Sequence, residues 1–163
     1  MNRSLVALGF MLASPMAFAI TCASPGANIS TTPFNGAGNT CGAADEFGQA
    51  CSGSVFAAGP SNIHQLNVGN ANNFTVSVTP SGGYDVFIAV IGPGCGPAAP
   101  CVADADDAGP DAAETVTVTG ATPGTYYLLV DSTAAAAGPL GCGPYTVSVT
   151  GTLPVELQSF SVD

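Results

Sequence analysis

Apolar and hydroxyl residues alternate with a period of two in the later part of the chain. Three segments show this most clearly: TVSVTP at 75–80, TVTVTG at 115–120 and TVSVTG at 146–151. Successive side chains of a strand point to opposite faces of its sheet, so the valines of each segment share one face and the hydroxyls the other. The pattern predicts three strands whose core residues are Val76, Val78, Val116, Val118, Val147 and Val149.

Two other runs are more continuously apolar. YDVFIAVI at 84–91 and TYYLLVDS at 125–132 are typical of central strands covered on both faces. Turn residues separate the pieces, as in PSGG at 80–83 and GATPG at 120–124. No segment shows a helical period with caps, and the Ala-rich stretch at 133–137 is interpreted as a loop.

These signals predict an all-β fold, an antiparallel β-sandwich or jelly roll of six to nine short strands, over residues 61–152. Residues 20–60 are rich in Gly, Asn, Ser and Thr. We expect them to form an irregular segment that packs on the sandwich and is held by disulfides. Residues 153–163, LPVELQSFSVD, are expected to form a last edge strand or a tail.

The first 19 residues have the pattern of a secretory signal peptide. Arg3 precedes an apolar run, and Ala17-Phe18-Ala19 forms a cleavage motif. The alternative is a buried N-terminal helix. The apolar run is too short to span a bilayer, and no second long apolar segment follows. The prediction is a secreted or cell-surface protein without a membrane span.

Charge excludes several classes of partner. The net charge is −10, with eleven carboxylates, and Arg3 is the single basic side chain apart from His64. Phosphate contacts need Lys or Arg, so the composition argues against nucleic acid as a partner and also against anionic membrane surfaces. It is compatible with metal ions, cationic partners or simple solubility.

All six cysteines follow the predicted signal peptide, as expected for disulfides in an exported chain. Two spacings are short, Cys41 to Cys51 and Cys95 to Cys101, and their pairing leaves Cys22 with Cys142. This pairing is one of fifteen connectivities. The alternative of a zinc site is disfavoured because no CxxC pair is present.

An acidic turn, CVADADDAGPDAAE at 101–114, is the strongest candidate for a metal site. Asp104-x-Asp106 with Gly109 matches the opening of an EF-hand loop, but Ala108 and Thr115 break the pattern. A different calcium loop remains, because hard oxygen ligands suit calcium. Its predicted ligands are Asp104, Asp106, Asp107 and Asp111. The alternative is a solvated turn, in which Asp side chains bond nearby backbone amides.

Catalytic chemistry finds little support. His64 is the single histidine and lies in strand-like SNIHQLNV; the sequence has no Gly-x-Ser-x-Gly elbow and no phosphate loop followed by Lys. No pair of carboxylates stands out as an acid and a base. The prediction is that the protein is not an enzyme.

Five later segments of the chain occur in an order that is typical of a known domain. YDVFIAV, DADDAG, ETVTVTG, PGTYYLLVDS and GPYTVSVTG follow one another between residues 62 and 152. This series resembles the bacterial pre-peptidase C-terminal domain. The resemblance implies a non-catalytic β-sandwich attached to secreted enzymes, with calcium-dependent polymer-binding modules among its relatives.

Two functions remain in view. The first is an extracellular binding or accessory module, stabilised by calcium, that contacts an unidentified polymer or protein through its hydroxyl-rich strand faces and Tyr84, Tyr126, Tyr127 and Tyr145. Most of these tyrosines are expected to be packing residues. The alternative is a self-assembling structural subunit whose terminal strand pairs with a neighbour. A calcium-dependent hydrolase is disfavoured because base and nucleophile are missing.

Overall fold

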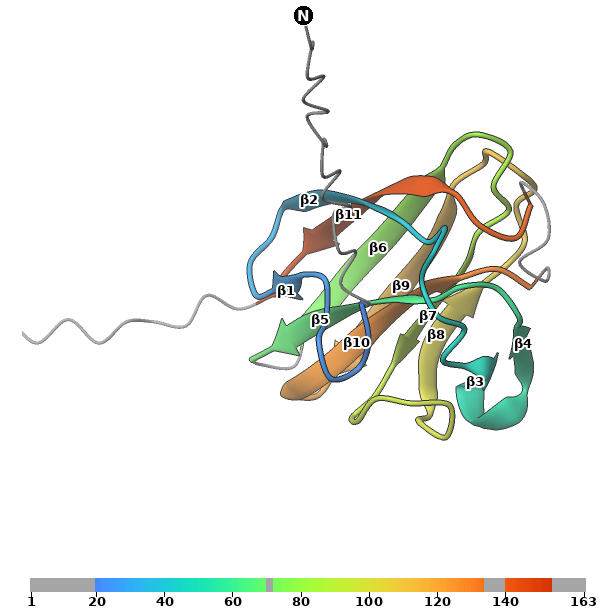
Figure 1. The fold of residues 1–163 in the computed structure, drawn as a ribbon. Coiled ribbons are helices and arrows are strands. Elements are labelled where there is room, and N and C mark those ends of the chain that lie inside the picture. Colours follow the sequence, from blue (N-terminus) through green and yellow to red (C-terminus); the bar gives the residue numbers. More distant parts are fainter. Residues whose placement is uncertain (1–19, 70–71, 134–139, 154–163) are drawn as a thin grey trace, which may run out of the picture.

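The computed structural model describes residues 20–69, 72–133 and 140–153, which form two β-sheets packed face to face (Figure 1). Sheet A has the strand order β1-β5-β10-β7-β8, sheet B has the order β2-β11-β6-β9, and β3 and β4 form a separate hairpin. The predicted sandwich is confirmed. The elements are β1 (Asn28–Ile29), β2 (Phe34–Asn39), β3 (Gly48–Ala50), the 3-10 turn η1 (Cys51–Gly53), β4 (Val55–Ala57), β5 (Asn62–Val68), β6 (Asn72–Pro80), β7 (Phe87–Ile91), β8 (Cys101–Ala105), β9 (Glu114–Ala121), β10 (Gly124–Asp131) and β11 (Pro144–Gly151).

The three alternating segments are neighbours in sheet B. β6 lies between β9 and β11, and Val76 is opposite both Val116 and Val149. All six predicted valines are at most 5% exposed, and they pack against sheet A, so the prediction of a core face is confirmed. Burial of each side chain contributes about 1.5–3 kcal/mol.

Sheet A is covered on both faces. In β7, Ile88 and Val90 face sheet B, whereas Phe87, Ala89 and Ile91 belong to a second cluster on the opposite face. All five residues of β7 are buried, and the central part of β10 divides in the same way. The prediction of two central strands is confirmed. Phe47 and the β3–β4 hairpin cover the second cluster.

The segment 20–60 differs from the expected irregular wrapping. It contributes β1, which pairs parallel to β5, β2, which pairs antiparallel to β11, and the β3–β4 hairpin. The reason is tertiary packing, which overrides the weak strand propensity of glycine. Gly38 of β2 lies against the ring of Tyr145, where any side chain would overlap the phenol.

The sandwich extends one residue past the expected boundary at its C-terminal side. Leu153 is 4% exposed and belongs to the core cluster between the sheets. The predicted signal peptide (1–19), most of the Ala-rich stretch (134–137) and the tail (154–163) lie outside the described residues. Within the described ranges no helix is long and apolar enough to cross a bilayer.

All six cysteines form disulfides, but the predicted pairing is wrong. The bonds are Cys22–Cys95, Cys41–Cys142 and Cys51–Cys101. They join residues 73, 101 and 50 positions apart, whereas the prediction favoured two short loops.

Local hydrogen bonds explain why the short spacing between Cys95 and Cys101 led to a wrong predicted pairing. The loop from Cys95 to Cys101 is already closed by backbone bonds from Gly92 N to Pro100 O (3.0 Å) and from Ala99 N to Gly96 O (2.9 Å). A disulfide removes more entropy from the unfolded chain when it closes a longer loop. Each of the three observed bonds joins one cysteine of the N-terminal third to one of the sandwich, in addition to the backbone pairing of β1 and β2.

We expect loss of Cys41–Cys142 to destabilise the protein strongly. Replacing both cysteines with Ala should lower the free energy of unfolding by about 2–5 kcal/mol, because the bond closes a long loop. Urea unfolding followed by circular dichroism measures the change, with the fully reduced wild type as the control that loses all three bonds. An unchanged midpoint in the double variant would contradict the expected stabilisation, and two free thiols in that variant, counted by thiol titration, would contradict the assigned pairing.

Candidate binding surfaces

The outer face of sheet B is an array of hydroxyl and amide groups. On β6 and β9, Thr75 is opposite Thr117 and Ser77 is opposite Thr115, with hydroxyl–hydroxyl hydrogen bonds of 3.0 and 2.9 Å. Each hydroxyl keeps further capacity to donate or accept. We call this surface the hydroxyl face; it comprises Asn35, Ala37, Asn39, Thr75, Ser77, Thr79, Thr115, Thr117, Thr146, Ser148 and Thr150.

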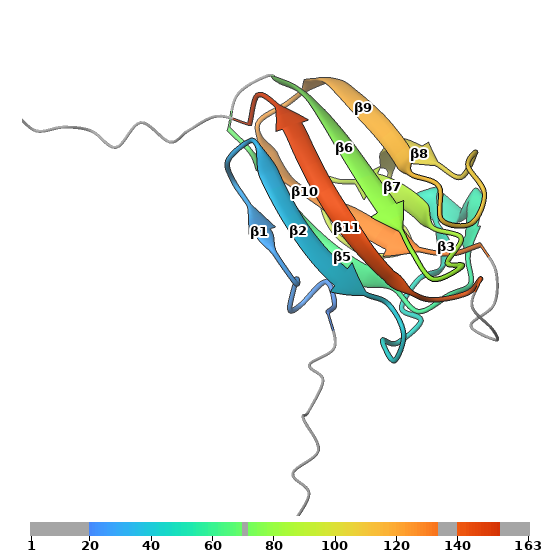
Figure 2. The ribbon, with the colours of Figure 1, turned by 90° about the horizontal axis from the view of Figure 1, so that it is seen from above.

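The hydroxyl face carries no charge and no aromatic ring. The four tyrosines proposed as contacts do not contribute to it, because Tyr84, Tyr126 and Tyr145 are at most 4% exposed and Tyr127 packs on the second cluster of sheet A. Their main role is packing, as expected. Figure 2 shows the four strands of sheet B side by side, with β2 at one edge and β9 at the other.

The acidic turn does not bring the predicted calcium ligands into one group. Asp111 has a φ of 61° and accepts a hydrogen bond from Gly83 N (2.8 Å), which ties the turn to the loop between β6 and β7. Asp104 lies instead beside the Cys51–Cys101 disulfide, in the one group of potential metal ligands found among the described residues. The two sulfurs of that group are bonded to each other, so they offer no thiolate.

Other carboxylates gather near Asp106. Burial raises the pKa of the Asp106 carboxyl, a hydrogen bond from Thr133 opposes this, and the charges of Asp85, Glu114 and Asp107 raise it further. Asp85 Oδ1 is buried and has no hydrogen-bond partner in the described part of the chain. Sequence reasoning missed Asp85, because only the packing of β7 beside β8 and β9 brings it to the turn.

Calcium binding therefore remains a prediction, and substitution of Asp106 is its most direct test. At 100 times the dissociation constant, calcium adds about 2.7 kcal/mol, which should raise the melting midpoint by several degrees. The expected shift disappears on adding a chelator and in Asp106→Asn. Glu46→Gln removes an exposed carboxylate outside the turn and serves as the control. No shift at millimolar calcium would leave the solvated turn as the explanation.

Asp131 is the most deeply buried carboxylate of the described residues. It is 0% exposed and accepts hydrogen bonds from Ser61 Oγ (2.5 Å), Gly59 N (3.0 Å) and Ser132 N (2.6 Å). Burial raises its pKa to about 6, although these three donors act in the opposite direction. Asp131 thereby ties the end of β10 to the segment before β5, which is a structural role.

His64 is buried in β5 and faces the start of β11. Its Nε2 lies 2.8 Å from Tyr145 Oη, and Asn62 Nδ2 donates to the same oxygen (3.1 Å). Burial lowers the pKa of His64 to about 4, so the ring is neutral at pH 7. The expected strand position is confirmed. Among the described residues no serine hydroxyl bonds to this imidazole, and no cysteine is free.

His64 and Asp131 both destabilise the fold when charged, and the effects of these two groups change in opposite directions with pH. The folded-state pKa of His64 lies below its unfolded value, so protonation below pH about 6.5 destabilises the fold. The folded-state pKa of Asp131 lies above its unfolded value, so ionisation destabilises the fold as the pH rises from about 4 to 6. Each destabilisation reaches about 3 kcal/mol in full. Between pH 4 and 6 one grows while the other declines, so their opposite pH slopes nearly cancel and their sum stays almost constant.

We predict that single variants expose these opposite slopes. Asp131→Asn should lose stability on acidification from pH 6.5 to 4, because the His64 contribution is then unopposed. His64→Gln should lose stability as the pH rises over the same interval. Urea midpoints measured at several pH values test both, with the wild type as the nearly flat reference. Parallel slopes in the two variants would be incompatible with the assigned roles.

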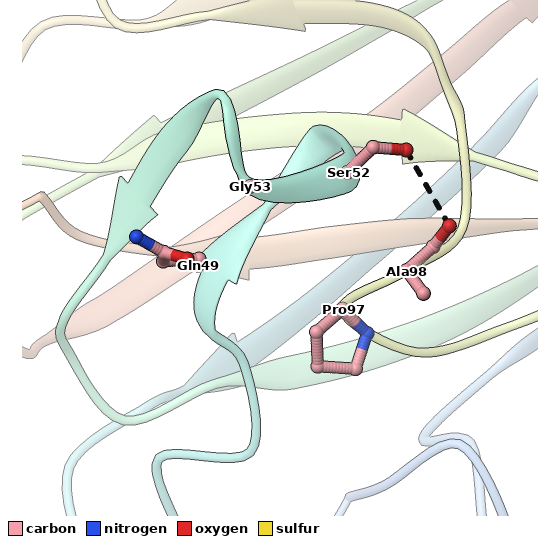
Figure 3. Close-up of a pocket in the computed structure, with 5 residues that line it drawn as sticks. All are labelled: Gln49, Ser52, Gly53, Pro97 and Ala98. Carbon is pink, nitrogen blue, oxygen red and sulfur yellow. Dashed lines mark hydrogen bonds between the residues drawn. The ribbon is translucent and has the colours of Figure 1, made fainter.

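A hollow of about 330 Å³ lies between β3, η1 and the loop before β8 (Figure 3). Its lining residues carry no charge: Gln49, Ser52, Gly53, Pro97 and Ala98. Ser52 donates a hydrogen bond from Oγ to Ala98 O (3.4 Å), which joins the two walls, and it adopts a left-handed φ of 57°. No basic group lines the hollow to activate this hydroxyl, so its chemistry is limited to hydrogen bonding.

Comparison with known proteins identifies the fold and no family. No family model matches the chain, and no curated protein matches it. Several solved structures are similar, among them the following three. The pre-peptidase C-terminal domain of collagenase from Bacillus anthracis is 20% identical, with a TM-score of 0.48; the match covers 77% of this chain and 96% of that one.

Two further similar structures belong to proteins with different roles. PliG of Aeromonas hydrophila, a periplasmic inhibitor of g-type lysozyme, is 14% identical, with a TM-score of 0.47 and coverage of 77% and 96%. CorA, a surface-associated copper-binding protein of Methylomicrobium album BG8, is 10% identical, with a TM-score of 0.52 and coverage of 78% and 98%. The domain family named from the sequence is thus among the similar structures, and the CorA match shows a common fold alone.

Proposed function

We propose that this protein is an extracytoplasmic, non-catalytic module that binds an uncharged polymer through the hydroxyl face. The observation that carries the proposal is the array itself: four adjacent strands that present hydroxyls and amides and no charge. Neighbouring strands lie about 4.8 Å apart, and alternate residues of one strand about 6.8 Å apart. A regular grid of weak hydrogen-bonding groups suits a ligand that repeats, because each bond alone contributes only about 0.5–1.5 kcal/mol.

The ligand is proposed to be uncharged because of the electrostatics of the chain. A polyanion would be repelled by a protein with a net charge of −10 that has no Lys or Arg among its described residues. A polycation would be drawn to the carboxylates around Asp106, away from the hydroxyl face. A neutral polysaccharide has hydroxyls that can both donate to and accept from this face.

Two observations support a location outside the cytoplasm and a role without catalysis. Three disulfides among six cysteines are typical of oxidising compartments. His64, the single histidine, is bonded to Tyr145 and points into the sandwich, and no catalytic family is identified.

Binding to insoluble neutral polysaccharides such as cellulose, chitin and β-glucan tests the proposal. The double variant Thr75→Val/Thr117→Val removes two hydroxyls at nearly constant size and should weaken binding about tenfold. Thr31→Val changes an exposed threonine outside the face and should bind like the wild type. Co-sedimentation isotherms at physiological salt provide the affinities.

Two results would overturn the proposal. One is the absence of binding to any neutral polymer in this panel while a polyanion or a polycation binds. The other is equal loss of affinity in the double variant and in Thr31→Val, since that would place the contact outside the hydroxyl face.

A further inference from the structure

The sandwich has four edge strands, and three of them are protected against pairing. In sheet A, β1 has only two residues, and β8 carries Asp104 and the disulfide-bonded Cys101. In sheet B, β9 begins at Glu114 and lies against β8 of the other sheet, near the carboxylates around Asp106 (Figures 1 and 2). Short edges, edge charges and covered edges are the usual means by which sheets avoid edge-to-edge pairing.

β2 has none of these protections. It spans six residues, pairs with β11 in continuous register without a bulge, and contains no proline and no charge. Its other side has no strand partner among the described residues. Figure 2 shows β2 as the outermost strand of sheet B. Its unpaired backbone groups are a template for another strand.

The distribution of charged residues determines which partner strand can pair with β2. No residue from 20 to 44 is charged, and neither β6 nor β11 carries a charge, whereas most carboxylates of the described residues gather at the β8 and β9 side. β2 and β9 are opposite edges of sheet B. Two copies of this acidic chain would repel each other in most orientations, but least when their β2 edges meet.

We propose that β2 pairs with β2 of a second copy, antiparallel about a two-fold axis centred near Gly36 and Ala37. The two sheets B then form one continuous sheet of eight strands. The two β9 strands are separated by seven inter-strand steps, about 34 Å. This is several times the screening length of about 8 Å at physiological salt, so the acidic edges do not repel each other appreciably. The partner is a second copy because the edge is self-complementary and uncharged.

This inference stands independently of the proposed function. If both hold, the dimer presents one hydroxyl face of double width, and a long polymer could contact both halves at once with increased avidity. Dimer formation is measured without any polymer, so failure of one proposal can be distinguished from failure of the other.

Sedimentation equilibrium of the disulfide-bonded protein tests the inference. The expected result is a reversible dimer with twice the monomer mass, whose dissociation constant falls as sodium chloride is raised, because salt screens the repulsion between acidic copies. A monomer at every concentration up to the solubility limit overturns the proposal. So does a dimer that dissociates in salt or on adding a chelator.

Three charge variants locate the interface. Asn35→Asp is nearly isosteric, Ala37→Asp lies near the proposed axis, and both add like charges to the two meeting edges. Each should weaken dimerisation at least tenfold. Thr119→Asp adds the same charge to exposed Thr119 of β9 and should leave the dimer intact. Equal effects in all three variants, with melting midpoints unchanged, would place the interface elsewhere and overturn the proposal.

Removal of residues 154–163 tests the competing occupant of the edge. The tail follows Leu153, and Gly151 O accepts a hydrogen bond from Thr32 just before β2 begins (2.6 Å). The shortened chain should dimerise like the full chain. A dimer that forms only after the tail is removed would assign β2 to the tail of its own chain and overturn the proposal.

Discussion

The layer of valines between the two sheets is the contact on which the rest of the structure depends. Sheet B can present hydroxyls to solvent on one side because Val76, Val116 and Val147 are buried against sheet A on the other. Strict alternation couples the two faces, since a register shift of one residue would exchange them. The packing of the core and the candidate binding surface therefore arise from the same pattern.

A second constraint is the absence of Lys and Arg from the described residues, which leaves the carboxylates without ionic partners. Asp131, inside the fold, is held by three hydrogen-bond donors, whereas most other carboxylates gather at the edge formed by β8 and β9. The opposite edge and the hydroxyl face stay neutral. The proposed contact with an uncharged polymer therefore lies on the neutral side of the molecule.

Two of the three disulfides act on segments outside the valine layer, whereas Cys41–Cys142 joins the segments next to the paired ends of β2 and β11 in sheet B. The β3–β4 hairpin covers the second apolar cluster of sheet A, yet it pairs with neither sheet. Cys51–Cys101 attaches it to β8, and Cys22–Cys95 attaches the N-terminal segment to the loop before β8. Cys51–Cys101 thus attaches a hairpin that has no backbone pairing to either sheet, whereas Cys22–Cys95 reinforces a segment that already pairs with β5 through β1.

The sequence by itself determined the all-β class, the central strands around Ile88 and Leu129, the inward valines and the packing role of most tyrosines, because strand alternation and apolar runs are local signals. Only the tertiary structure decided the partners of the cysteines, the inclusion of β2 in sheet B and the approach of Asp85 to Asp106. These depend on which loops meet once the sheets have packed. Contacts between residues far apart in the chain produce no periodic pattern in the sequence. Cysteine spacing therefore favoured pairs that are close in the chain, which was wrong. Hydrophobic alternation likewise did not reveal β2, an edge strand that contains two glycines.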